Sequence, residues 1–309
     1  MYFPGITPHV GQAEVWTRLP DAFRRTQPSA WADANKSGDQ IDSFLEGPVF
    51  DGQGNLYVTD IPFGRVFRID SAGNWELIVQ YDGEPNGMKW LKPGVLLITD
   101  YKNGLMSLDV ERGVVAPFLQ RRNSESFKGV NDLSFDSQGN LYFTDQGQTG
   151  LHDPTGRVYR LRPSGQVDLL LSNVPSPNGV VLSPDEKFLF VAATRGNEVW
   201  RAALMDDGTV SKVGRFFVSH GPSGPDGLAM DDKGNLAIAN PGLGCVWLLD
   251  HHACPIGVWK STAGRVLTNM AFGGVDGRTL YCTESETGSI LTVQMPNSGS
   301  VVHARQMAG

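Results

Sequence analysis

The chain has 309 residues and a formal net charge of −7, and charged residues make up only 19% of it. An acidic chain without a basic stripe argues against nucleic acid as a partner, and the absence of any run of about 18 apolar residues argues against a membrane partner. The 37 glycines and 19 prolines favour short strands joined by turns over long surface helices.

The first part of the chain is expected to hold one strand followed by an irregular stretch. Residues Ala13 to Leu19, AEVWTRL, alternate apolar and polar side chains as a half-buried strand does. Residues 20–43 are polar and irregular, and we expect them to form a connector or a flap. Because residues 1–16 lack a basic start followed by an apolar run, they do not read as a secretory signal.

Six similar segments follow. Each has a polar residue at its first or second position, continues as an apolar strand, turns on Gly or Asp, and runs into a second strand. The six are EGPVFDGQGNLYVTD from Glu46, PNGMKWLKPGVLLITD from Pro85, VNDLSFDSQGNLYFTD from Val130, PNGVVLSPDEKFLFVAAT from Pro177, PDGLAMDDKGNLAIAN from Pro225 and TNMAFGGVDGRTLYCTE from Thr268. Turns such as DGQGN and DDKGN are hairpin signals, because Gly and Asn tolerate the positive φ that tight turns need.

These repeats have the length of propeller blades. A further hairpin follows each segment, so one unit holds about four strands, and the opening polar residues lie 40 to 48 residues apart. The sequence therefore predicts an all-β fold, a single six-bladed β-propeller domain over residues 1–309 with four-stranded blades. The last unit is one strand short, and we expect the strand at Ala13–Leu19 to close the ring and protect its sheet edges.

The polar residue that opens each repeat occupies the same place in its blade, at the start of the innermost strand. Six such residues would converge on the propeller axis at one face, near the mouth that residues 20–43 could cover. They are Glu46, Asn86, Asn131, Asn178, Asp226 and Asn269. All carry oxygen donors, which hard cations such as Ca²⁺, Mg²⁺ and Mn²⁺ prefer. Asn-Gly and Asp-Gly are also common turn dipeptides, but six polar residues in register favour a site.

Other residues give no competing site. Asp60, Asp100 and Asp145 end the Thr-Asp pairs of three repeats and are expected to cap turns. The histidines lack zinc-site spacing, and neither a GxSxG elbow nor a P-loop is present. Cysteines 245, 254 and 282 indicate free thiols in a reducing compartment, with a bridge between the first two left open, so a cytoplasmic location is expected.

The motifs of these repeats resemble those of the senescence marker protein/gluconolactonase family, which includes luciferin-regenerating enzyme-like proteins. The resemblance rests on FLEGPVF, GVNDLSFDSQGNLYFTD, PNGVVLSPDEKFLFVA, PDGLAMDDKGNLAIAN and LTNMAFGG with TLYCTE, and it covers about residues 45–293. It implies a six-bladed propeller with one divalent metal, most readily Ca²⁺, with Mg²⁺, Mn²⁺ and Zn²⁺ as alternatives. The metal ligands implied by position are Glu46, Asn131, Asn178 and Asp226. Asn86 and Asn269 match positions that line the substrate pocket.

Together with the converging oxygen donors, the resemblance implies a metal-dependent hydrolase that opens a small lactone ring. Asp226 is the expected general base, with direct attack by its carboxylate as a variant, and Glu46 is mainly a ligand beside it. Met88 and Trp90 are less suited to a sugar polyol, which leaves the lactone open. A phosphotriesterase-like hydrolase and a non-catalytic binding propeller are the alternatives, and nothing calls for an oligomer.

Overall fold

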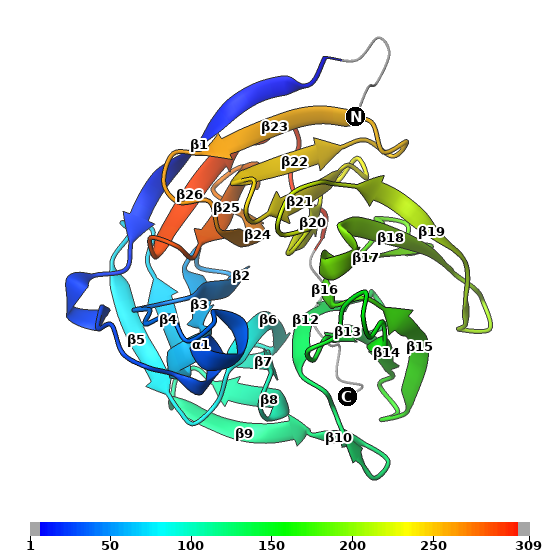
Figure 1. Cartoon of the computed structure of the whole chain (residues 1–309), viewed down its shortest axis with the longest axis horizontal. Coiled ribbons are helices and arrows are strands. Elements are labelled where there is room, and N and C mark those ends of the chain that lie inside the picture. Colours follow the sequence, from blue (N-terminus) through cyan, green and yellow to red (C-terminus); the bar gives the residue numbers. More distant parts are fainter. Residues whose placement is uncertain (1–6, 302–309) are drawn as a thin grey trace.

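The strands of the repeats form antiparallel sheets that stand around a central axis like the blades of a propeller (Figure 1). The structure, a computed structural model, describes residues 7–301. Four of its sheets have four strands each, paired in chain order. They contain β2 (Leu45–Phe50), β3 (Leu56–Asp60), β4 (Arg65–Ile69) and β5 (Trp75–Gln80); β6 (Pro85–Lys92), β7 (Val95–Asp100), β8 (Gly104–Asp109) and β9 (Val114–Leu119); β12 (Val130–Phe135), β13 (Leu141–Asp145), β14 (Gly156–Leu161) and β15 (Val167–Val174); and β16 (Pro177–Leu182), β17 (Phe188–Ala193), β18 (Glu198–Leu204) and β19 (Val210–Val218).

The remaining strands of the repeats and the strand β1 form one eight-stranded sheet. In sheet order it contains β20 (Leu228–Met230), β21 (Leu236–Asn240), β22 (Cys245–Leu249), β23 (Pro255–Ser261), β1 (His9–Arg18), β26 (Ser289–Gln294), β25 (Thr279–Glu284) and β24 (Leu267–Gly273). The strand β1 pairs in parallel with β23 and antiparallel with β26. The propeller architecture predicted from sequence is therefore confirmed, but four separate blades are seen beside this joined sheet, where six separate ones were predicted.

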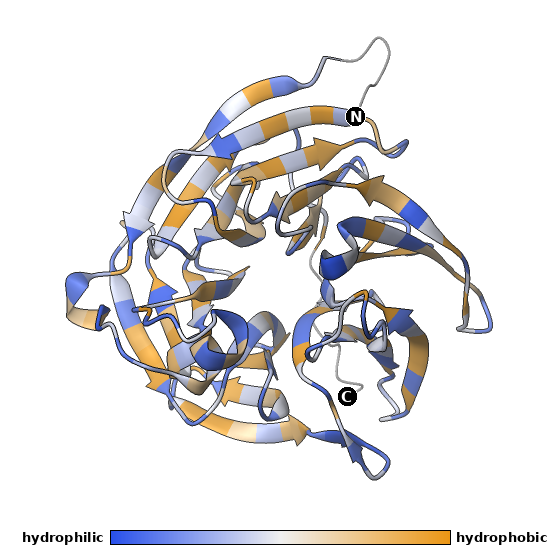
Figure 2. Ribbon diagram, in the orientation of Figure 1, coloured by the Kyte–Doolittle hydropathy of each residue, from blue (hydrophilic) through white to orange (hydrophobic). Residues whose placement is uncertain are grey.

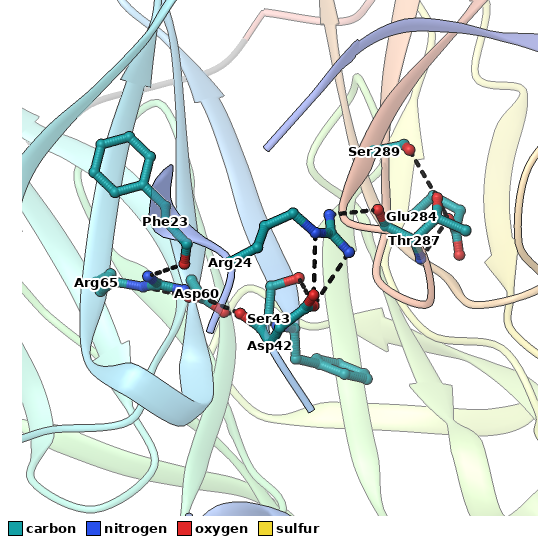
Figure 3. Close-up of polar contacts among 10 residues, drawn as sticks. Phe23, Arg24, Asp42, Ser43, Asp60, Arg65, Glu284, Thr287 and Ser289 are labelled. Atoms are coloured by element: carbon teal, nitrogen blue, oxygen red, sulfur yellow. Dashed lines mark hydrogen bonds and ion pairs between the residues drawn. The ribbon is translucent and has the colours of Figure 1, made fainter. Parts of the chain in front are cut away.

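The segment 20–43 is less irregular than predicted. It contains the 3₁₀ turn η1 (Asp21–Phe23) and the short helix α1 (Ala30–Asn35). The helix forms because the Ser29 hydroxyl accepts the Ala32 N–H at 3.1 Å and caps its first turn. Arg24 holds the segment to the blades, since its guanidinium donates to the carbonyl of Thr287 at 2.8 Å, and within the segment it pairs with Asp42 at 3.0 Å (Figure 3).

Apolar side chains fill the spaces between neighbouring sheets. Strands near the axis such as β3 and β13 are buried along their whole length, whereas the outer strand β5 is partly exposed. Figure 2 shows the corresponding alternation of apolar and polar positions along the outer strands. Phe143 packs in one cluster with Leu97 of the preceding sheet, and burying such a side chain stabilises the fold by about 2–3 kcal/mol.

The minor elements complete the described chain. They are the hairpin of β10 (Arg121–Arg122) and β11 (Glu125–Ser126), and the 3₁₀ turns η2 (Ile61–Phe63) and η3 (Thr194–Gly196). All three cysteines are free, so the alternative bridge between Cys245 and Cys254 is not formed. Between residues 7 and 301 there is no helix with the length and apolar character needed to cross a membrane.

Candidate metal and catalytic centre

The first strands of the sheets surround the axis and contact one another in turn, β2 with β6, β6 with β12, and onward to β24 and back to β2. Five of the six predicted residues lie at the start of these strands, and the sixth, Asp226, lies two residues before β20. All six side chains are buried, with exposed fractions of 3% to 8%. They are Glu46, Asn86, Asn131, Asn178, Asp226 and Asn269.

Irregular pairing turns these side chains toward the axis. In five of the innermost strands the pairing register shifts within the first few residues, for example between Glu46 and Val49 in β2 and between Val130 and Leu133 in β12. The same irregularity occurs in β6, β16 and β24. Such bulges re-aim side chains and are common beside active sites.

Glycines after the opening residues let the strands approach one another. An ideal Cβ at Gly179 would lie 2.4 Å from the carbonyl oxygen of Asp226, and one at Gly227 would lie 2.3 Å from Oδ1 of Asn269. No side chain fits at these distances. The Asn-Gly and Asp-Gly dipeptides are therefore packing features of adjoining strands, and the alternative that they are hairpin turns is wrong.

Threonines of the Thr-Asp motifs fix the same backbone from the neighbouring sheet. Thr59 donates to the Asn86 carbonyl at 2.8 Å, Thr144 donates to that of Asn178 at 2.8 Å, and Thr99 bonds that of Asn131. Similar bonds join Thr194 to Pro225 at 2.7 Å and Thr268 to Leu45 at 2.9 Å. These buried bonds hold the start of each innermost strand against the preceding sheet.

The aspartates that follow these threonines cap backbone, as predicted. The carboxylate of Asp60 accepts the N–H of Phe44 at 2.7 Å, and that of Asp145 accepts the N–H of Gly129 at 2.9 Å. Asp100 accepts the N–H groups of two residues in the turn after β7. They position the strands on which the site residues lie.

Four of the converging side chains present oxygens without partners. Oδ1 of Asn86, Asn131, Asn178 and Asp226 is buried and accepts no hydrogen bond from any residue in the described part of the chain. Each buried polar atom without a hydrogen bond lowers the stability of the fold by about 1–3 kcal/mol. Four such oxygens in one place therefore indicate a binding site for a ligand. No group of three or more His, Cys, Asp and Glu side chains between residues 7 and 301 could hold a metal. A hard cation here would therefore rely on amide as well as carboxylate oxygens, which suits Ca²⁺.

Two amide side chains orient the donors. Gln146 accepts from Nδ2 of Asn131 at 2.9 Å, which leaves Oδ1 of that amide unpartnered. Asn269, predicted to line the substrate pocket, donates to Glu46 at 2.9 Å, while its Oδ1 accepts the N–H of Met270 at 2.8 Å. Asn269 thus contacts a predicted metal ligand directly.

The site carries strong electrostatic repulsion. Burial raises the pKa of Glu46 to about 7, against hydrogen bonds from Gly47 and Asn269, and the charge of Asp132 raises it further. Burial also raises the pKa of Asp226 well above its usual range, and the charges of Glu46 and Asp132 add to the effect. Glu46 and Asp226, 180 positions apart in the chain, are therefore electrostatic neighbours.

Asp132 is a residue of the candidate site that was not predicted from the sequence. Its side chain is 4% exposed, and burial raises its pKa while the ammonium of Lys89 opposes that shift. A signal was present in the sequence: four of the six repeats have Gly directly after the opening residue, where the third repeat has Asp132. Asp132 adds a third buried carboxylate to the two that were predicted.

A cavity of about 750 Å³ lies along the later parts of the same innermost strands. Asp132 and Lys89 line it together with Trp90 and Phe135. The space inside the ring is therefore not filled by side chains, and Asp132 connects it with the candidate centre.

Comparison with known proteins identifies the family of the chain. Residues 44–286 match the SMP-30/gluconolactonase/LRE-like region. Lactonase drp35 of Staphylococcus aureus (strain MRSA252) is 32% identical over 242 residues, which cover 74% of this chain and 71% of that protein. Lactonase drp35 of Staphylococcus epidermidis is 32% identical over 228 residues, 69% of this chain and 68% of that protein.

A solved structure shares the fold at lower identity. Regucalcin, a calcium-binding protein from Agrobacterium tumefaciens, superposes with a TM-score of 0.76 at 20% identity, covering 97% of this chain and all of its own. With a matched propeller, a matched sequence region and lactonases among its relatives, the chain belongs to the SMP-30/gluconolactonase/LRE-like family.

Proposed function

We propose that the protein is a divalent-metal-dependent lactonase whose centre is the ring of converging oxygen donors. The observation that carries the proposal is the group of four buried oxygens without partners beside the carboxylate of Glu46. Its curated relatives are lactonases. When bound, a divalent cation would act as a Lewis acid on the lactone carbonyl and stabilise the negative charge that develops on its oxygen.

Glu46, Asn131, Asn178 and Asp226 are the residues that we assign to the cation. Two carboxylates balance a 2+ charge, and two amides add donors without further charge. Calcium is the first choice because every donor is oxygen, with magnesium, manganese and zinc as alternatives. We assign Asn269 to positioning Glu46, on the basis of its 2.9 Å hydrogen bond. Asn86, with its free Oδ1, serves either the cation or the substrate.

We assign proton transfer to Asp226. Its carboxylate accepts a proton from the attacking water as the water oxygen bonds to the carbonyl carbon. The ring C–O bond then breaks, and Asp226 returns its proton to the leaving ring oxygen, so the product is an open hydroxy acid and the carboxylate is restored. Direct attack of Asp226 on the carbonyl carbon is the alternative, and it would leave an acyl-enzyme for water to hydrolyse.

The proposal is tested by metal content and turnover. Purified protein should carry about one divalent ion per chain, and chelation should abolish hydrolysis of a lactone panel until the ion is restored. Asp226→Asn should lower kcat by about 100-fold or more. Asp82→Asn, which removes the same charge from a side chain that is 90% exposed, is the matched control. A folded, metal-free protein that gains nothing from added cations would support a non-catalytic propeller instead.

We also propose that the eight-stranded sheet works as two blades joined through β1, which would give a single six-bladed domain with residues 20–43 as a flap. The closed order of contacts among the six first strands supports this count.

Three free cysteines support a cytoplasmic location.

A further inference from the structure

The helix α1 lies close to the mouth at which the candidate residues begin their strands (Figure 1). Its Trp31 packs with Ile61 and Phe44, so the helix is fixed to the first blade just ahead of Glu46. Across the mouth, Gln148 of the third blade donates to Oδ1 of Asn35 at 3.3 Å. The flap is therefore held from two sides.

Lys36 follows this helix, and its ammonium group lies within electrostatic reach of Asp226. The side chain is half-buried, and its Nζ lies 4.6 Å from the centroid of the Phe44 ring. Within residues 7–301 the ammonium donates no hydrogen bond and forms no ion pair. Burial lowers the pKa of Lys36, and the charge of Asp226 is the strongest influence against that shift.

Arg195 supplies a second positive charge from the opposite side. It lies in η3, whose Thr194 donates to the carbonyls of Ser176 at 3.0 Å and Pro225 at 2.7 Å, directly beside Asp226. Its guanidinium is exposed and has no carboxylate within ion-pair distance in the described part of the chain. Both Arg195 and Lys36 oppose the burial that raises the pKa of Asp226.

Two arginines of this region are paired with carboxylates. Arg24 pairs with Asp42 and Arg65 with Asp60. Besides Asp226, two acids face Lys36, but neither pairs with it: Asp39 is exposed, and the carboxylate of Glu286 accepts the backbone N–H of Arg265 at 2.6 Å. An unpaired, half-buried ammonium is costly, so this arrangement calls for an anion.

We propose that Lys36 and Arg195 select lactones that carry an anionic substituent, namely a carboxylate. The inference rests on the proposed lactonase function. With a divalent cation balanced by Glu46 and Asp226, and with Lys89 opposing the charge of Asp132, Lys36 and Arg195 retain positive charge for the substrate. A neutral lactone would leave the ammonium of Lys36 without a partner, whereas a carboxylate would bond it in a partly dry environment where such bonds are strong.

The experiment measures selectivity in the calcium-loaded enzyme. The probes are glucaro-1,4-lactone and glucono-1,4-lactone, which share a ring and differ in carrying a carboxylate or a neutral terminal group. Wild type should prefer the carboxylate lactone by about tenfold or more in kcat/KM. Lys36→Gln and Arg195→Gln should each reduce that preference about tenfold, mainly through KM, and Lys36→Arg should retain part of it.

The matched control is Lys187→Gln, which removes a 75% exposed lysine that pairs with Asp185 in a hairpin turn. This variant should keep the wild-type preference. An unchanged preference in both site variants, or no preference in wild type, would overturn the inference.

A binding measurement separates this inference from the proposed function. Calorimetry of the calcium-loaded protein compares glucarate with gluconate, the dianion and the monoanion, and needs no turnover. Tighter binding of glucarate that Lys36→Gln abolishes would support the charge selection even if no lactone were hydrolysed. Equal affinity for glucarate and gluconate would contradict the charge selection, whatever the rate of lactone hydrolysis.

Discussion

Among the single residues, three buried carboxylates dominate the electrostatics of the candidate centre. Glu46, Asp132 and Asp226 lie within electrostatic reach of one another, and each loses hydration by burial. Such an arrangement destabilises the metal-free fold and favours cation binding, because a divalent ion removes the repulsion. The site therefore trades stability for function.

Asp132→Asn separates these two effects. The change keeps the oxygen that accepts the N–H of Leu133 at 2.8 Å but removes one buried charge. We expect the free energy of unfolding of the metal-free protein to rise by about 1 kcal/mol, and calcium affinity to fall about tenfold. Denaturant titration and calorimetry measure the two quantities. Asp82→Asn should change neither, and a destabilised Asp132→Asn would contradict the repulsion.

The residues of the site could be predicted only in part. The six opening residues share one position in a repeat, so their convergence follows from the architecture alone. Asp132 lies one position later, and the bulge at the start of β12 that brings it to the centre is a tertiary feature. The bond from Asn269 to Glu46 joins the last and first repeats, and nothing local in either repeat specifies it.

Among the elements, the innermost strands depend on glycines for their spacing. Gly179→Ala would place a Cβ 2.4 Å from the Asp226 carbonyl oxygen and 2.8 Å from the Leu228 nitrogen, both backbone atoms that cannot move aside easily. We expect a loss of about 2 kcal/mol or more in stability, with weaker metal binding because Asp226 shifts. Gly52→Ala is the control, since no atom lies within 4 Å of its added Cβ. Thermal unfolding and metal titration of both variants decide the outcome.

Strands and hairpins were the predictable elements, because alternation and Gly-Asn turns are local signals. The helix α1 was not predicted, since it is only six residues long and is held by the Ser29 cap and by Trp31. The joined sheet was not predicted either. The sequence shows that β1 can complete a blade, but its second pairing, with β23, depends on how two blades meet.

For the whole molecule, the raised pKa of Glu46 predicts an unusual pH dependence of stability. Below an unfolded pKa of about 4.5 both states hold the proton, and above the folded value of about 7 neither does. Between these limits the folded state binds more protons, so stability of the metal-free protein should fall as pH rises through this window. The loss should be on the order of a few kcal/mol.

Chemical unfolding at pH 5, 6, 7 and 8 in chelator measures this slope. Excess calcium should reverse it, because the bound ion favours the ionised carboxylate, and Glu46→Gln should flatten it. A metal-free protein whose stability rises from pH 5 to pH 8 would contradict the burial of an ionisable Glu46.

The placement of β1 has a consequence for biosynthesis. Its residues are translated before their partners, since His9 pairs opposite Gly257 and Glu14 opposite Thr292. At about 5–20 residues per second, the ribosome supplies these partners only after an interval on the order of tens of seconds. Throughout that interval β1 is an open edge that other nascent chains can join. Crowded polysomes should therefore be where this protein is most prone to misassembly.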